Sequence, residues 1–258
     1  MEIIKSLKGN SGCTLNIFNT PDGSFVRKQS PSIAYNSRLQ HQKQKQKDFY
    51  SKFIKAPKIY KEGFNNDLYY FDMEYIPGIK FSDYINENNI QKTYPYMDII
   101  LDFIKSNNTI KHTAIDSIIK NKIKEIKNKT TDAILSGDRI DIDKVPLSYC
   151  HGDLTLENII INNKGDLYLI DFLDSFINTN LIDYSKILQD LVFLWSWRNE
   201  DTKPYTKILL LQEYINKKLS KEEYNISYQL MKLNLLRILP YTEKNTKMYN
   251  NIINFTKI

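Results

Sequence analysis

Three polar side chains near the middle of the chain have types and spacing suited to phosphate chemistry. Asp153 and Asn158 stand five residues apart in segment 151–158, HGDLTLEN, and Asp171 follows the apolar run 167–170. Phosphoryl transfer needs an acceptor hydroxyl aimed at the γ-phosphate and divalent metal to neutralise the phosphate oxygens. Asp153 can accept the hydroxyl proton, while Asn158 and Asp171 offer the oxygen ligands that Mg²⁺ prefers. Their combination favours a paired nucleotide and metal site over a chance turn and strand end.

This arrangement, with Ile170-Asp171-Phe172 as its last part, resembles the aminoglycoside phosphotransferase and choline kinase family. The family is a small-molecule branch of the protein-kinase-like fold, and the resemblance covers nearly the whole chain. It implies that Asp153 is the catalytic base, that Asn158 and Asp171 hold Mg²⁺, and that ATP is the phosphoryl donor, with GTP as the alternative.

Two further residues are expected to support the catalytic loop. His151 precedes a glycine and follows an expected strand end, so it is expected to hydrogen-bond the loop backbone rather than to act as a base. Asp183 matches a position where the family has an acid that braces this loop, and bracing is favoured over direct contact with substrate.

The N-terminal part contains the residues that the resemblance assigns to the nucleotide. Lys28 matches the family lysine that contacts the α- and β-phosphates, and its neighbour Arg27 is the rival candidate. The turn Gly9-Asn10-Ser11-Gly12 resembles the phosphate-covering loop, although it lacks the full G-x-G-x-x-G pattern. Segment 73–78 resembles the hinge that binds adenine through main-chain groups of residues such as Glu74 and Ile76; the alternative is an ordinary strand end.

One departure from the family pattern concerns the expected helix from Ser37 to Phe53. This helix normally carries an acid that pairs with the strand lysine, but residues 40–47 read QHQKQKQK and no acid precedes Asp48. A glutamine could hydrogen-bond Lys28 without neutralising it, which would leave the charge available to phosphate. The other interpretation is that Lys28 is held in a different way.

The C-terminal part is expected to form the acceptor pocket. Trp195 and Trp197 could stack on a sugar or a cationic head group, although aromatic residues at helical spacing pack more often than they bind ligand. Asp174 faces either the substrate or solvent. No Ala-Pro-Glu element follows Asp171, so the docking platform of protein kinases for peptides is not expected.

Alternating strands and turns dominate the first 78 residues, and helical periodicity dominates most of the remainder. The predicted fold is α+β and bilobal, protein-kinase-like, with a small antiparallel N-terminal sheet lobe (1–78) and a larger, mainly helical C-terminal lobe (79–258). The expected strands cover 3–7, 14–18, 25–28, 56–60 and 68–75. The expected helices after the first one cover 81–86, 94–106, 114–127, 182–197, 204–219, 221–238 and 243–255.

Composition limits the protein class. The 258 residues are 41% hydrophobic and carry a formal net charge of +6, which is ordinary globular composition with a basic surface. The lysines of 120–129 are interpreted as a solvated helix face. Aromatic residues, which would favour nucleic acid binding, are not interleaved with these lysines. Two cysteines without a CxxC motif, and no apolar run near the roughly 20 residues that span a bilayer, predict a cytoplasmic protein with no membrane partner.

The sequence thus favours an ATP- and Mg²⁺-dependent kinase that phosphorylates a hydroxyl of a small-molecule acceptor. A sugar, an amino sugar or an amino alcohol is expected, with a slight preference for a sugar-like precursor of surface polysaccharide. Phosphorylation of aminoglycoside antibiotics is the enzymatic alternative. The missing helix acid also keeps open a different class, a nucleotide-binding pseudokinase that acts as a scaffold.

Overall fold

A computed structural model describes residues 2–8, 12–21, 23–107, 111–130 and 142–256. The chain divides into two compact units. The first contains residues 1–81 and 158–174, and the second contains residues 82–157 and 175–258. The sequence places the division at residue 78, whereas the first unit extends to residue 81 and also contains segment 158–174.

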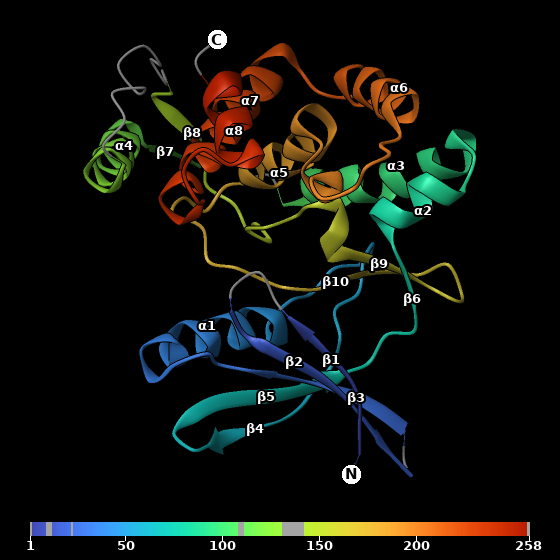
Figure 1. Cartoon of the computed structure of the whole chain (residues 1–258). Helices are drawn as coiled ribbons and strands as arrows, with labels where there is room; N and C mark the ends of the chain where they lie inside the picture. The colour runs from blue at the N-terminus through green and yellow to red at the C-terminus, as the bar shows by residue number, and fades with distance from the viewer. Residues whose placement is uncertain (1, 9–11, 22, 108–110, 131–141, 257–258) are drawn as a thin grey trace. The chain divides into compact units, whose positions relative to one another are not determined.

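The first unit is built on a five-stranded antiparallel sheet in the order β1-β2-β3-β5-β4 (Figure 1). Helix α1 (Asn36–Lys47) packs against β4 and β5, and Leu39 joins Tyr69 and Phe71 in the buried core. This unit thereby holds β3, the strand that carries Lys28, between two neighbours. The strands are β1 (Glu2–Lys8), β2 (Thr14–Thr20), β3 (Gly23–Gln29), β4 (Ile59–Asn65) and β5 (Leu68–Glu74).

A second, three-stranded sheet of this unit joins segments that are distant in sequence. Its order is β10 (Leu167–Leu169), β9 (Ile159–Asn162) and β6 (Gly78–Lys80). A Cβ atom at Gly78 would collide with the main-chain oxygen of Ile161, so only glycine allows this pairing. Main-chain hydrogen bonds between Lys55 and β10 attach the sheet to the rest of the unit.

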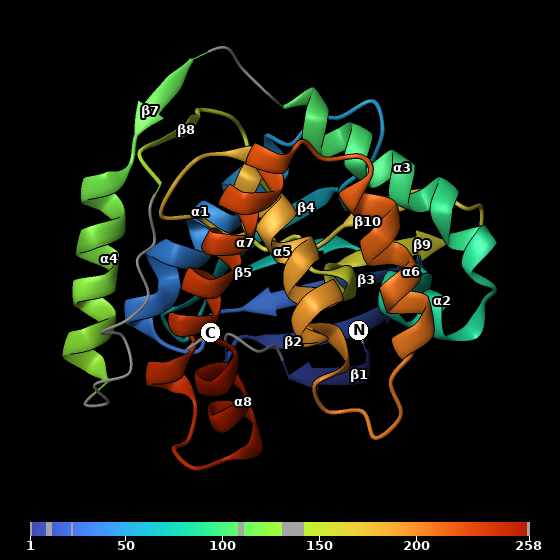
Figure 2. The same cartoon turned by 90° about the horizontal axis from the view of Figure 1, so that it is seen from above.

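The second unit is mainly helical, and its centre is helix α5 (Asn180–Phe193). Helix α5 contacts α3, α6 and α7, and most of its side chains are buried. Figure 2 shows α4 at one side of this unit and α3 and α6 at the other. The remaining elements are α2 (Phe81–Glu87), α3 (Ile90–Ser106), α4 (Asp116–Lys129), α6 (Tyr205–Asn216), α7 (Lys221–Leu236), α8 (Lys247–Thr256), β7 (His112–Ala114) and β8 (Lys144–Pro146).

The bounds of most elements differ from the expected ones by a few residues, and three of the larger differences concern the first helix, the fourth strand and the central helix of the second unit. The helix expected over 37–53 ends at Lys47, and the strand expected over 56–60 begins at Ile59 and continues to Asn65. The helix expected over 182–197 ends at Phe193, because Leu194 adopts the left-handed conformation with φ 59°. A separate 3₁₀ turn, η4 (Trp195–Trp197), follows.

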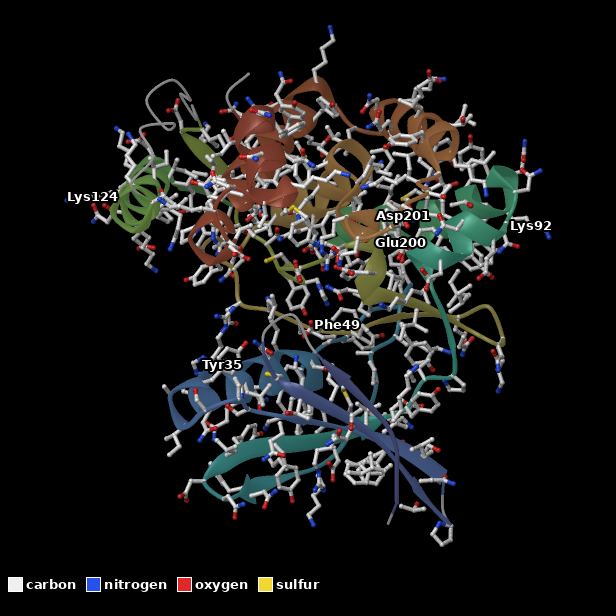
Figure 3. The ribbon with its side chains drawn as sticks, in the orientation of Figure 1. Tyr35, Phe49, Lys92, Lys124, Glu200 and Asp201 are labelled. Carbon is white, nitrogen blue, oxygen red and sulfur yellow. The ribbon has the colours of Figure 1, made fainter. Side chains whose placement is uncertain are left out.

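Four lysines of segment 120–129, which are Lys120, Lys124, Lys127 and Lys129, are exposed on α4. Lys120 pairs with Asp116 at 2.7 Å and Lys122 pairs with Glu125 at 2.6 Å. Figure 3 shows Lys124 directed outward from this helix. In the part of the chain that the structure describes, no helix is both long and apolar enough to span a membrane.

Candidate functional site

The predicted catalytic loop, residues 151–158, is attached to α5 through buried Asp183. Its carboxylate accepts hydrogen bonds from the main-chain N–H groups of His151, at 2.7 Å, and Gly152, at 3.0 Å. His151 is fully buried, and its Nδ1 accepts from the N–H of Asp153 at 3.3 Å. Gly152 has φ 91°, which L side chains rarely adopt, so the turn requires glycine. These are contacts of the kind that the supporting roles predicted for His151 and Asp183 would need.

A second acid of α5 holds the other end of the loop. Asp190 is fully buried and accepts from the N–H of Leu156 at 2.6 Å and from the N–H of Ser196 at 2.7 Å. Burial raises the pKa of Asp190 to about 7, although these donors act in the opposite direction. Asp190 thus ties the loop and η4 to the same helix.

Asp153 itself contacts a third residue of α5. Lys186 Nζ lies 3.0 Å from Asp153 Oδ1, and only 13% of the lysine side chain and 23% of the aspartate side chain are exposed. Lys186 and Asp190 follow Asp183 by three and seven residues, which is the spacing of one helix face. One face of α5 therefore supports the loop from His151 to Leu156.

In the first unit, Lys28 lies between a glutamine and the second acid of the motif. Its buried Nζ donates to Gln42 Oε1 at 3.1 Å and also contacts the carboxylate of Asp171. The Gln42 Nε2 atom donates to the hydroxyl of Tyr35 at 3.2 Å, which sets the orientation of the amide. Tyr35 and α1 are visible in Figure 3. Gln42 therefore occupies the place that the missing helix acid left open, and it holds Lys28 without neutralising it.

Arg27, the rival of Lys28, has a different set of contacts. Its Nε and Nη2 donate to the two carboxylate oxygens of Asp72 at 2.7 and 2.8 Å. Its guanidinium also lies 3.9 Å from the centre of the Tyr70 ring. The hydrogen bonds to Asp72 raise the pKa of Arg27. This bidentate pair links β3 to β5, whereas Lys28 alone of the two contacts Asp171.

The two residues expected to hold metal belong to the same unit. The N–H of Ile170 donates to the main-chain oxygen of Asn158 at 3.0 Å, which brings Asn158 next to Asp171. Asp171 has φ 63°, an uncommon conformation for a residue other than glycine and one that clusters at functional sites. Its side chain is 37% exposed and already holds one positive charge, that of Lys28. An exposed carboxylate beside an amide-bearing residue fits the oxygen preference of Mg²⁺.

Histidine, cysteine and carboxylate side chains do not form a metal cluster here. Within the described residues, no group of three or more of them could hold a metal ion. A site made from Asn158 and Asp171 would offer an amide oxygen and a carboxylate to a metal ion.

The structure describes only some of the other residues that the sequence predicts to bind the nucleotide. Gly9, Asn10 and Ser11 lie outside the described residues, while Gly12 is exposed with φ 79°. Glu74 is the last residue of β5. Its N–H donates a hydrogen bond to the main-chain oxygen of Lys58, and its carboxylate accepts one from the N–H of Lys58. Ile76 is buried in the segment that follows.

The three candidates for the acceptor pocket differ in exposure. Trp197 is 1% exposed, and its Nε1 donates to Asn86 at 2.9 Å, which favours a packing role over stacking on an acceptor. Trp195 is partly exposed, and its ring lies 4.4 Å from the guanidinium of Arg198. Asp174 belongs to the first unit, where its carboxylate is exposed 3.7 Å from His41.

Sequence reasoning missed two of the residues around the loop, Lys186 and Asp190. Both are charged residues in a helix that is otherwise largely apolar, and both lie at helical spacing from Asp183. That spacing is the signal that could have identified them.

Comparisons with known proteins agree with the resemblance stated above. A model of the phosphotransferase enzyme family matches residues 129–214, which include the catalytic loop, Asp171 and α5. No curated protein matches the sequence at a significant level.

Solved structures share the fold across nearly the whole chain. An aminoglycoside phosphotransferase APH(4)-Ia mutant, in a ternary complex with ADP and hygromycin B, aligns with a TM-score of 0.63 and 14% identity over 98% of this chain and 91% of that one. The choline kinase LicA from Streptococcus pneumoniae aligns with a TM-score of 0.52 and 16% identity over 99% of this chain and 92% of that one. A protein described as a fructosamine-3-kinase from Haemophilus somnus aligns with a TM-score of 0.56 and 13% identity over 98% of this chain and 90% of that one.

These findings confirm the predicted α+β, protein-kinase-like fold. They also confirm the resemblance to aminoglycoside phosphotransferases and choline kinases. Family match and fold together support a kinase that acts on a small molecule.

Proposed function

We propose that this chain is an ATP- and Mg²⁺-dependent phosphotransferase that moves the γ-phosphate to a hydroxyl group of a small molecule. The observation that carries the proposal is the contact between Lys28 and Asp171, which are separated by 143 positions in the sequence. A buried lysine beside an exposed carboxylate is the pair that a nucleotide phosphate and its metal require. ATP is favoured as the donor because structural neighbours were determined with ADP and with AMP-PNP.

Each residue then has a defined part in the reaction. Asp153 accepts a hydrogen bond from the acceptor hydroxyl and orients its oxygen toward the γ-phosphate. It takes the hydroxyl proton as the new P–O bond forms and the bond from the γ-phosphorus to the β–γ bridging oxygen breaks, which releases ADP. Lys28 binds phosphate oxygens of the nucleotide, and Gln42 keeps its Nζ in position. Asp183 and Asp190 hold the main chain of the loop and thus the direction of the Asp153 side chain.

Asn158 and Asp171 are the residues that would hold Mg²⁺. When bound there, Mg²⁺ supplies positive charge that offsets the charge developing on the phosphate oxygens. Asp171 would present its carboxylate to the metal, and Lys28, which contacts the same carboxylate, would face the phosphate oxygens of the nucleotide.

The acceptor is proposed to be a sugar, an amino sugar or an amino alcohol, with a sugar-like precursor of surface polysaccharide preferred. An aminoglycoside is the alternative acceptor, because a structural neighbour was determined with hygromycin B. A pseudokinase scaffold is disfavoured because Gln42 holds Lys28 in contact with Asp171, so that the absence of a helix acid does not leave the lysine displaced.

The test is phosphorylation of a broad acceptor panel with Mg²⁺ and radiolabelled ATP. The wild-type chain is expected to label at least one acceptor, and Asp153→Asn to lower kcat by about 10² to 10⁴. Nucleotide binding should persist in this variant, because Lys28 and Asp171 are unchanged. Absence of product from every acceptor, combined with identical behaviour of Asp153→Asn, would refute the proposal.

A further inference from the structure

The acids of the catalytic loop are already paired with cations from the following segment of the same unit. Asp153 Oδ1 lies 3.0 Å from Lys186 Nζ, and Glu157 Oε1 lies 3.0 Å from Arg198 Nη1. All four side chains are less than a quarter exposed, so water screens the two pairs less than it screens surface pairs. The loop therefore presents two neutral ion pairs rather than two carboxylates.

We infer that Lys186 is a positioning and specificity-determining residue that directs the enzyme toward acceptors without a positive charge near the reacting hydroxyl. The inference rests on the proposed function and narrows its substrate class. The favoured acceptors are neutral or anionic hydroxyl compounds such as sugars and sugar acids, and the disfavoured ones are amino sugars, aminoglycosides and amino alcohols.

Geometry gives the first reason. An acceptor hydroxyl served by Asp153 must lie within about 3 Å of a carboxylate oxygen, which puts the hydroxyl oxygen within roughly 6 Å of Lys186 Nζ if it contacts Oδ1 and within roughly 8 Å if it contacts Oδ2. An ammonium group on a neighbouring carbon of the acceptor would therefore lie close to the lysine. Lys186 repels such an ammonium group and thereby offsets the attraction that the Asp153 carboxylate alone would exert on it, and partial burial strengthens both effects.

Charge balance gives the second reason. A carboxylate alone would attract a cationic acceptor, but Lys186 cancels the charge of Asp153 before any acceptor arrives. Arg198 does the same for Glu157. The first acids after Arg198 in the sequence, Glu200 and Asp201, are exposed in the loop after η4 and are labelled in Figure 3. They carry no contact with the catalytic loop among the hydrogen bonds and ion pairs of the described residues.

The position of Lys186 also explains how it orients Asp153. It lies one helical turn after Asp183, which holds the N–H groups of His151 and Gly152. The same helix thus fixes both the main chain and the side chain of the base. Loss of the lysine should therefore affect turnover as well as acceptor choice.

The experiment compares acceptors that share a carbon skeleton and differ in charge: glucose, glucosamine and glucuronate, and the corresponding galactose series, with choline and hygromycin B added. The wild-type chain is expected to have a higher kcat/KM for the neutral or anionic member of each series. Lys186→Met should shift the preference toward the amino sugar by about tenfold, which corresponds to about 1.4 kcal/mol. Lys186→Arg, which keeps the charge, should retain the wild-type order.

Two controls separate this effect from a general loss of structure. Lys122→Met breaks a lysine–carboxylate pair of α4 and should leave acceptor preference unchanged. The double variant Glu200→Gln, Asp201→Asn should also leave it unchanged. Thermal unfolding of every variant reports on folding, and the ratio of two kcat/KM values does not depend on the fraction of folded enzyme.

The outcomes are distinguishable. Preference of the wild-type chain for the cationic member, or an unchanged preference in Lys186→Met, would overturn the inference and leave the proposed function intact. Absence of phosphorylation of every acceptor would instead overturn the proposed function, and the inference with it.

Discussion

Asp190 accepts a hydrogen bond from the main-chain N–H of Leu156 at 2.6 Å while its side chain is completely buried. The same carboxylate accepts from the N–H of Ser196 at 2.7 Å, so a single acid joins the end of the catalytic loop to the turn after α5. An acid in this environment links the stability of the loop to pH.

Asp190 should lower the stability of the protein as pH rises. Burial raises its pKa to about 7 from an ordinary value of 3.8, so the folded state binds a proton more strongly than the unfolded state does. The contribution of the protonated acid is fully present below about pH 4 and is lost as pH rises through about 7. The loss is on the order of 4 kcal/mol, from about 1.4 kcal/mol per pKa unit.

Urea unfolding of wild type and Asp190→Asn at several pH values measures this contribution. Asparagine does not titrate, so the difference in free energy of unfolding between the two proteins isolates Asp190. That difference should decline between about pH 4 and pH 7. A difference that stays constant over this range would contradict the prediction.

Arg27 and Lys28 should separate stability from nucleotide binding. Arg27→Met leaves the buried carboxylate of Asp72 without its bidentate partner and is expected to cost about 2 kcal/mol of stability. Lys28→Met removes the residue that contacts Asp171 and should weaken ATP binding by at least tenfold. Calorimetric titration with Mg²⁺-ATP and thermal unfolding of both variants provide the check. If Arg27→Met weakened ATP binding as much as Lys28→Met, the assignment of the phosphate contact to Lys28 would be wrong.

Gln42→Glu should weaken nucleotide binding, although it restores the acid found in related kinases. The new carboxylate would neutralise Lys28 and compete with phosphate for its ammonium group, and we expect a rise in Kd for ATP of about three- to tenfold. Gln44→Glu makes the same chemical change at an exposed position of the same helix and serves as the control. Tighter ATP binding by Gln42→Glu would mean that the glutamine is a defect rather than an adaptation.

Gly152→Ala should abolish most activity. Its φ of 91° places an alanine in a strained conformation, at a cost of about 1 to 3 kcal/mol, and relief of that strain would move Asp153. Gly165, in the turn between β9 and β10, has φ 83° and offers a matched control. Both alanine variants should lose similar stability in thermal unfolding, but only Gly152→Ala should lose kcat by about 10² or more. Equal loss of activity in the two variants would show that strain alone, rather than the position of Asp153, accounts for the effect.

The strands and most helices could be predicted because their patterns are local. The alternation of β1, β2 and β3 around tight turns and the apolar spacing of α3, α5 and α7 are visible in short windows of sequence. The end of α1 could not be predicted in the same way. Phe49 directly follows the polar run 40–48, and its ring packs on Phe172 with 5.1 Å between centroids, a contact with a residue far away in sequence.

The motif residues could be identified from their spacing, but their surroundings depend on residues that sequence reasoning treated as ordinary. Gln42 was one of several glutamines in a polar segment, and only tertiary structure shows that it is the one buried beside Lys28. The helical spacing of Lys186 from Asp183 is visible in the sequence, but its ion pair with Asp153 requires the fold. Local pattern therefore identifies the reacting groups, whereas long-range packing decides which side chains tune them.

The first unit consists of two separate segments of the chain, which has a consequence for the order of folding. Strand β6 follows the five-stranded sheet in sequence, and its partner β9 is synthesised only after residues 82–157 have been made. At the usual rate of about 5 to 20 residues per second, the ribosome needs several seconds to add that segment. The strand edge of β6 must stay unpaired during this time, so a nascent chain that ends before β9 exposes an edge open to aggregation or to a chaperone.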